Sequence, residues 1–281
     1  MRPFAVVWLL DTTRKSILAA ALASALCGAL LWAARPVFGQ DEKLPKAEEI
    51  LDRYVEATGG KAAYAKIKNR VSKGRLEMPA QGMEGSILIY AARPNLAYSI
   101  VEIPGVVKQE RGTDGKVAWE RQSLTGPRLL EGSERALFMH EAAFNGELKW
   151  RALYKKVATR GVEEVEGKPA YKVELTIDDE NKLIAYYDKQ SHLLVKSVMT
   201  VKTHGVEMNV ETFIGDYKKV DGILTAHKHH QKVMGMEQTI TFDSIEVNAK
   251  IEKDRFKLPE DVKELVRQQQ EAKQEKKGPV P

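Results

Sequence analysis

The sequence predicts a mainly β protein of the α+β class, with one large, curved antiparallel sheet, an N-terminal helix and a helical insert. Three observations lead to this prediction. Apolar residues recur at every second position through much of residues 70–247, which is typical of half-buried strands. Turn dipeptides such as Asp114-Gly115 and Asp221-Gly222 separate these runs and favour hairpins. Helical periodicity is confined to short stretches, so the sheet dominates the fold.

The first 39 residues have the pattern of an export signal. Arg14 and Lys15 precede an uncharged, largely apolar run, residues 16–34, and Gly39 precedes a polar start. We therefore expect a protein that works in the periplasm. A retained anchor in the inner membrane, facing the periplasm, is one alternative. A lipid-modified Cys27 is another, which the bulky Leu26 before it disfavours.

Composition excludes several classes of function. Cys27 is the single cysteine of the 281 residues, so beyond residue 39 we expect no disulfide, no cysteine-ligated metal and no thiol nucleophile. The net charge of +5 owes much to the basic residues before position 40, and the rest of the chain is close to neutral. We therefore expect no nucleic-acid partner. The predicted domain spans residues 40–262.

An amphipathic helix opens this domain. Pro45 suits a first helical turn, and apolar residues then recur at helical spacing, at Ala47, Ile50, Leu51, Tyr54 and Val55. Gly59-Gly60 ends the helix, and a short second helical turn follows over residues 61–67.

The next segments alternate with a period of two. In residues 170–177 the apolar side chains of Tyr171, Val173 and Leu175 fall on one face of the strand. Strands are predicted over residues 70–78, 84–91, 97–103, 107–112, 117–122, 170–177, 183–188, 194–202, 206–214, 224–233 and 237–247. One helical insert, residues 133–144, interrupts them, with Ser133 as its N-cap. It is the candidate lid.

The chain is predicted to end in a tail. A short turn is expected over residues 260–267. The run from 268 to 277 consists almost entirely of glutamine, lysine and glutamate and has no apolar face. We therefore predict a charged, disordered tail over residues 263–281.

Catalytic motifs are absent from the sequence, but one histidine cluster needs an interpretation. His227 and His229 would share a face of a strand and could hold one metal ion, while His230 would point the other way. Catalytic zinc usually takes a third protein ligand, and none is placed nearby in sequence. We favour a polar outer face for these residues, with a metal site as the alternative, and predict no cofactor.

Methionines on or beside the predicted strands offer two interpretations. Methionine is a weak strand former, and its flexible side chain suits a surface that accepts variable apolar shapes. They either fill the core or line a ligand site. These residues are Met78, Met83, Met199, Met208, Met234 and Met236.

The order of elements resembles the periplasmic lipoprotein-carrier superfamily, the LolA/LolB-like outer membrane lipoprotein-sorting proteins. The resemblance covers about residues 44–259. It rests on the export signal, the helix of residues 47–57 with Gly59-Gly60, the strand beginning near Lys73-Gly74, the segment 114–119 ending in Trp119, and the closing Phe256 to Pro259. It implies an incomplete antiparallel barrel closed by helices, and transient sequestration of acyl chains.

These observations predict a non-catalytic periplasmic carrier that encloses acyl chains of a lipid or lipoprotein, with a possible membrane or protein partner in the envelope. An envelope-anchored interaction domain without a cavity is the alternative, and a histidine-dependent metalloenzyme is less favoured. The residues predicted to line the cavity are Ile87, Ile89, Trp119, Val173, Leu175, Met199, Val201, Met208, Val210 and Met236.

Overall fold

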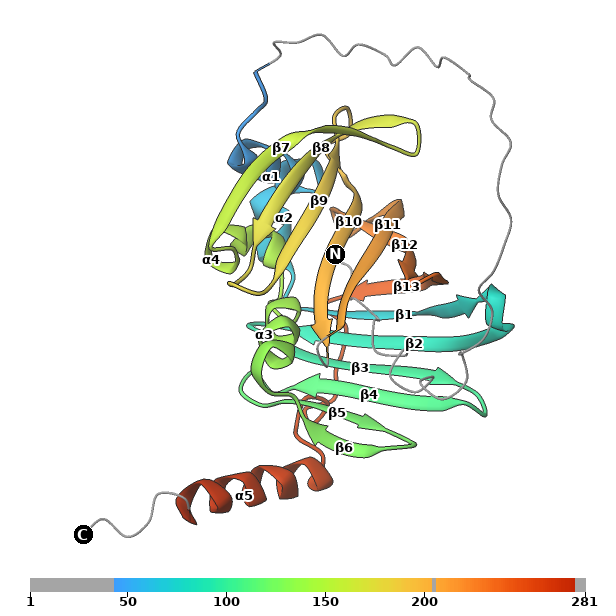
Figure 1. The fold of residues 1–281 in the computed structure, drawn as a ribbon, viewed down its shortest axis with the longest axis vertical. Helices are drawn as coiled ribbons and strands as arrows, with labels where there is room; N and C mark the ends of the chain where they lie inside the picture. The colour runs from blue at the N-terminus through green and yellow to red at the C-terminus, as the bar shows by residue number, and fades with distance from the viewer. Residues whose placement is uncertain (1–42, 204–205, 276–281) are drawn as a thin grey trace, which may run out of the picture.

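The computed structural model describes residues 43–203 and 206–275, which form one thirteen-stranded antiparallel sheet with helices (Figure 1). The predicted export signal, residues 1–39, lies outside the described residues. The strand order is β6-β5-β4-β3-β2-β1-β13-β12-β11-β10-β9-β8-β7. Because β6 and β7 are the two edges and do not pair, the sheet is an incomplete barrel, as predicted. The strands β7 to β11 are oriented at a large angle to the strands β1 to β6 (Figure 1).

The strands match the predicted ranges closely. Their bounds are β1 Asn69–Met78, β2 Met83–Ala92, β3 Leu96–Ile103, β4 Val107–Thr113, β5 Ala118–Gln122, β6 Gly126–Leu129, β7 Lys156–Val165, β8 Lys168–Thr176, β9 Lys182–Asp188, β10 Leu194–Thr203, β11 Val206–Val220, β12 Ile223–Val233 and β13 Met236–Val247. The helices are α1 Ala47–Ala57, α2 Gly60–Lys66, α3 Gly132–Glu141, α4 Trp150–Leu153 and α5 Glu260–Glu275, with short 3-10 turns η2 Pro79–Gln81 and η3 Gly146–Lys149.

Strands β6 and β7 were not predicted, and local irregularities explain why. The register of β7 against β8 shifts between Thr159 and Gly161, so the alternation of apolar residues breaks within β7. Strand β6 has only four residues, one of them Pro127, which leaves too short a pattern to detect.

Helix α1 forms where helical spacing of apolar residues predicted it. Its buried residues are Ala47, Ile50, Leu51, Tyr54 and Val55. The Tyr54 ring lies 5.3 Å from that of Tyr187 on β9, and Thr159 of β7 donates a hydrogen bond of 2.8 Å to the Pro45 carbonyl. The helix therefore packs against the face of the sheet formed by β7 to β9.

The prediction of a disordered tail is wrong for residues 263–275, which continue α5. Glutamine, lysine and glutamate are all good helix formers, and ion pairs three residues apart, such as Lys263 with Glu260, add to helix stability. Val262 is fully buried, and α5 lies against β6. Helix formation here depends on propensity and one anchoring residue rather than on an apolar face. Residues 276–281 lie outside the described part of the chain.

Candidate ligand-binding face

The sheet has an inner face, which we define as the face against which α1 and α3 pack. Alternation along the strands and the pairing between them place two apolar clusters on this face. The helix-covered cluster consists of Ala47, Ile50, Leu51, Tyr54, Leu137, Trp150, Tyr154, Tyr171, Val173, Leu175, Leu183, Ala185, Tyr187, Leu194, Met199, Val210, Ile214, Ala226 and Val233. The strand cluster consists of Leu76, Met78, Ile87, Ile89, Val101, Ile103, Val107, Ile240, Phe242 and Ile245.

The two clusters differ in their origin. The helix-covered cluster combines residues of α1, α3 and α4 with residues of β8 to β12. All ten buried members of the strand cluster come from β1, β2, β3, β4 and β13. Together they give the inner face extensive apolar surface on both halves of the sheet.

A row of buried polar side chains crosses the inner face between apolar rows. Ser197, Thr212, Gln231 and Gln238 occupy paired positions on β10, β11, β12 and β13. Gln238 donates to Gln231 at 2.6 Å, and Gln231 donates to Thr212 at 3.2 Å. These hydrogen bonds across strands fix the register of the row in a low-dielectric interior.

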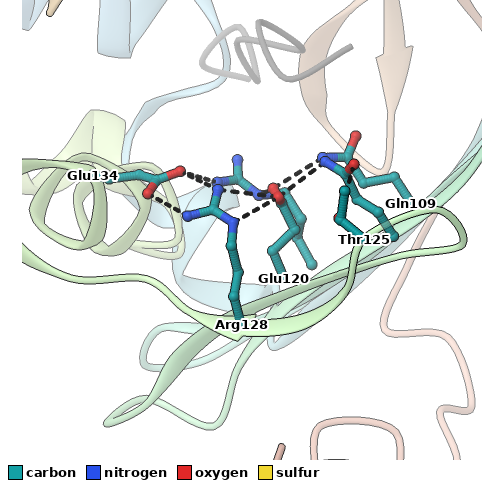
Figure 2. A network of polar contacts seen from close by, with 7 residues as sticks. Gln109, Glu120, Thr125, Arg128 and Glu134 are labelled. Atoms are coloured by element: carbon teal, nitrogen blue, oxygen red, sulfur yellow. Dashed lines mark hydrogen bonds and ion pairs between the residues drawn. The ribbon is translucent and has the colours of Figure 1, made fainter. Parts of the chain in front are cut away.

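The polar network at the other end of the sheet, where β4, β5 and β6 meet α3, contains charged residues (Figure 2). Glu120 of β5 is 2 % exposed and accepts hydrogen bonds from Gln109 at 2.9 Å, Gln122 at 3.1 Å and Arg128 at 3.0 Å. The guanidinium of Arg111 lies 2.7 Å from the same carboxylate. Four neighbouring side chains therefore compensate one buried carboxylate.

Glu134 connects this network to the candidate lid. Arg128 donates two hydrogen bonds to Glu134, at 2.7 and 2.6 Å, so the pair is bidentate (Figure 2). Arg111 lies 3.5 Å from Glu134, and its guanidinium is 5.1 Å from the centre of the Phe138 ring. Helix α3 is thus held on the inner face of β4 to β6 by charge and by ring stacking.

Helix α3 also reaches the opposite half of the sheet. Asn181, in the turn between β8 and β9, donates a hydrogen bond of 3.0 Å to the Ser133 hydroxyl, and Asp178 in turn orients Asn181. Leu137 of α3 belongs to the helix-covered cluster. The helix therefore bridges the two halves across the open side of the incomplete barrel.

Burial and pairing set the charge states in the network. Burial lowers the pKa of Arg111 to about 10, which still leaves it protonated at neutral pH. The hydrogen bonds to Glu134 raise the pKa of Arg128. The network therefore contains two cations, Arg111 and Arg128, facing the carboxylates of Glu120 and Glu134, and Glu141 adds a further negative charge near Arg111.

The histidines lie the other way round from the prediction. His227 and His229 are buried on the inner face, 5 % and 4 % exposed, while His230 is the outward residue, near Glu237 at 3.4 Å. The preference for a polar outer face was wrong because the pattern of alternating histidine and lysine does not show which face is buried. Within residues 43–203 and 206–275, no three potential metal-ligating side chains gather into a metal site.

The predicted lining residues do not all share one surface. Met199, Val210 and Met236 lie in one cross-strand row with Val233, and Met208 is partly buried beside them. Val173 and Leu175 belong to the helix-covered cluster, and Ile87 and Ile89 to the strand cluster. For Val201 only the backbone is described, which pairs with Met208.

Trp119 lies on the opposite, outer face of the sheet. Its neighbour Glu120 points inward, and the Trp119 ring fills the space over Gly112, where a Cβ atom would meet ring atoms at 2.8 Å. The Trp119 ring lies 6.0 Å from that of Tyr98, over which the Arg255 guanidinium stacks at 5.7 Å. The tryptophan therefore belongs to an outer aromatic layer closed by the segment after β13.

Sequence reasoning missed the charged network. A signal for it was present, because Gln109 and Arg111 precede the Asp114-Gly115 turn while Glu120 and Gln122 follow it at matching alternate positions. Polar residues of opposite charge on the same face of a hairpin indicate paired side chains.

Comparison with known proteins identifies the fold. No protein-family model and no curated protein sequence matches the chain. Among solved structures, a DUF1329 family protein from Desulfovibrio piger matches with a TM-score of 0.53 and 14 % identity, over 75 % of this chain and 97 % of that one. A putative outer membrane lipoprotein-sorting protein domain from Vibrio parahaemolyticus matches with a TM-score of 0.50 and 13 % identity, over 75 % and 97 %.

A LolA superfamily protein from Nitrosomonas europaea also matches, with a TM-score of 0.49 and 15 % identity over 76 % of this chain and 99 % of that one.

In the described part of the chain, no helix combines the length and the apolar composition needed to cross a bilayer. The fold predicted from the sequence resemblance is confirmed: the chain has the fold of the putative outer membrane lipoprotein-sorting protein domain.

Proposed function

We propose that this protein is a non-catalytic carrier that binds the acyl chains of a lipid or lipoprotein against the inner face of its sheet. The observation that carries the proposal is the pairing of a largely apolar inner face with a helix, α3, held across it by polar contacts. The fold shared with a putative lipoprotein-sorting domain supports it.

Burial of the acyl chain would provide the affinity. Each Å² of apolar surface removed from water contributes roughly 25 cal/mol, so one long chain gains several kcal/mol. Ile87, Ile89, Val173, Leu175, Met199, Val201, Met208, Val210 and Met236 would line the site. Trp119 is left out because its ring packs on the outer face.

Helix α3 would act as the lid. Its contacts with β6 and with the β8–β9 turn are hydrogen bonds and ion pairs, and Leu137 and Phe138 are its buried apolar side chains. Helix α1 contributes four residues to the helix-covered cluster, whereas α3 contributes only Leu137. A ligand could therefore enter by displacing α3 while the rest of the fold stays intact.

We further propose that the protein works in the periplasm after removal of residues 1–39, with residues 40–262 as the carrier domain. Mass spectrometry of the N-terminus tests this proposal. A start near Gln40 supports a soluble carrier, whereas a retained apolar segment would favour the alternative of an anchored interaction domain.

Ligand binding is tested by native mass spectrometry of the gently purified protein and by titration with a fluorescent fatty-acid probe. Met236→Arg places a charge among the lining residues and is expected to weaken probe binding at least about tenfold. Met234→Arg is the matched control, because Met234 is 67 % exposed at the tip of the same hairpin. If the wild-type protein shows no co-purified lipid and takes up no probe, the carrier function is refuted.

A further inference from the structure

Arg70 is a buried arginine that has no counter-charge among the described residues. It lies on β1 and is 8 % exposed. Its Nε has no hydrogen-bond partner, and no carboxylate of residues 43–203 or 206–275 lies within 4.0 Å of its guanidinium. Arg111, which is also buried, lies 2.7 Å from the Glu120 carboxylate. Because buried charges are almost always paired, Arg70 lacks the partner that its position requires.

The Arg70 side chain belongs to the inner face of the sheet. Ser72, two residues further along β1, pairs with Ile89 and Ile245 of the strand cluster, and alternate residues of a strand share a face. The Arg70 guanidinium is 5.9 Å from the centre of the ring of Phe144, in the segment that follows α3. The unpaired cation therefore lies on the same side of the sheet as the proposed acyl-binding residues.

The charges near Arg70 do not complete its hydrogen bonds. Burial raises the pKa of the Tyr64 hydroxyl, the charge of Glu147 raises it further, and the charge of Arg70 lowers it. Glu147 and Arg70 thus act on the same ring, but they form no ion pair within 4.0 Å. Glu147 offsets part of the positive charge at a distance, whereas a hydrogen bond needs an acceptor within about 3.5 Å of the donor.

An apolar strip begins beside Arg70 and runs along β1. Leu76 and Met78 of the strand cluster lie six and eight residues beyond Arg70 on the same strand, which is about 20–26 Å at 3.3 Å per residue. Ile87 and Ile89 border this strip on β2. One cation at the end of a long apolar surface is the complement of a molecule with one charged end and one hydrocarbon chain.

We infer that Arg70 binds the anionic head group of an acyl lipid, a carboxylate or a phosphate, while the chain lies along the strand cluster. This inference rests on the proposed carrier function and names the class of lipid. The planar guanidinium matches the paired oxygens of a carboxylate or phosphate. An uncharged head would leave the buried cation without a counter-charge, and such a lipid would bind more weakly.

Three ligands with the same oleoyl chain test the inference, each competing with a fluorescent acyl probe. Oleoyl lysophosphatidate and oleate are anionic, and monooleoylglycerol is uncharged. The wild-type protein is expected to bind at least one anionic ligand about tenfold more tightly than monooleoylglycerol, which is the usual effect of one charge-assisted hydrogen bond. Arg70→Met should abolish this preference and leave the affinity for monooleoylglycerol near the wild-type value. Inorganic phosphate alone should not displace the probe, because it has no chain to bury.

Arg75→Met is the matched control. Arg75 lies on the same strand with 63 % of its side chain exposed, and its loss should leave all three affinities unchanged. Arg70→Met should also raise Tm, because it removes an unpaired buried charge, and a raised Tm shows that the variant is folded. Arg70→Lys keeps the charge without the planar fork and should keep part of the preference.

The outcomes separate the inference from the carrier function. A wild-type protein that binds monooleoylglycerol as tightly as both anionic ligands overturns the inference and leaves the carrier function standing. An Arg70→Met variant that keeps the preference has the same meaning. Displacement of the probe by inorganic phosphate alone would overturn the assignment to a lipid head group. A wild-type protein that binds none of the three oleoyl ligands refutes the carrier function itself.

Discussion

At the scale of single residues, Glu120 shows how a buried charge is kept in the interior of this sheet. Its carboxylate is nearly inaccessible to solvent, yet each oxygen meets donors from neighbouring strands. Removing one partner of a buried ion pair leaves the other charge buried without compensation. The resulting loss of stability is larger than the stabilisation that the intact pair provides. Replacing one charged residue of this network with an uncharged one is therefore expected to destabilise the fold.

We predict that Glu120→Gln lowers the free energy of unfolding by about 3 kcal/mol, because Arg111 would remain buried without its main counter-charge. Urea unfolding followed by circular dichroism measures this. Asp243→Asn is the matched control, since Asp243 and its partner Arg75 are both more than half exposed, and the expected loss is below about 1 kcal/mol. Equal losses in the two variants would show that the network does not depend on its buried charge.

A second residue-scale prediction concerns pH. Burial alone would raise the pKa of Asp178, but hydrogen bonds from the Asn181 side chain and from the backbone N–H groups of Glu180 and Asn181 hold it below its usual value. The ionised carboxylate therefore stabilises the fold above its unfolded pKa of about 3.9, and this contribution is lost as the pH falls through the lower, folded pKa.

Asp178→Asn should accordingly destabilise the protein at pH 7, with the difference from wild type shrinking towards pH 2. Urea midpoints at several pH values test this. Asp179→Asn changes the neighbouring side chain, which is 93 % exposed, and should produce little difference at any pH. A destabilisation by Asp178→Asn that stays constant down to pH 2 would contradict the role given to the charge.

At the scale of elements, the spacing of apolar residues predicts a helix or strand correctly where one face of the segment is buried along its whole length. Helix α1 and most strands follow from the spacing of their apolar residues, because burial on one face imposes that spacing. Apolar alternation does not predict strand β7 because the register shift near Gly161 breaks it, and it does not predict α5 because that helix has no apolar face.

The candidate site was predicted less completely than the fold, again for physical reasons. Met199, Val210 and Met236 are predicted to line the cavity, and the structure places them in one row. The face of Trp119 depended on the register of β5, where a shift of one residue exchanges the two faces. The meeting of α3 with Arg128 and Arg111 depends on tertiary packing, which one-dimensional patterns do not contain.

At the scale of the whole molecule, the open sheet leaves two edge strands, and unpaired edges invite pairing with other chains. Strand β7 is interrupted by its shift near Gly161 and carries charged residues. Strand β6 is short, contains Pro127 and has α5 lying against it. The first turn of α5, with buried Val262, thus protects one of the two edges.

We predict that deleting residues 260–281 lowers the free energy of unfolding by about 1.5–3 kcal/mol, the usual contribution of one buried aliphatic side chain, and promotes self-association through β6. Deleting only residues 269–281 keeps Asp261, with its ion pair to Arg121, and Val262, and should leave both properties near wild type. Size-exclusion chromatography with light scattering and urea unfolding measure the two effects. A short deletion as damaging as the long one would contradict the assigned role of the first turn.

The pairing of β1 with β13 has a consequence for how the chain can be assembled. Every other pairing joins strands that are consecutive in the chain, so β1 to β6 and β7 to β13 are each a simple meander, and one ladder of hydrogen bonds joins them. That ladder requires a segment made near the start and one made near the finish. During synthesis the hydrogen-bonded ladder between the two meanders therefore cannot form until residues 236–247 have emerged, and a ribosome stalled before that point would present two sheets in place of one.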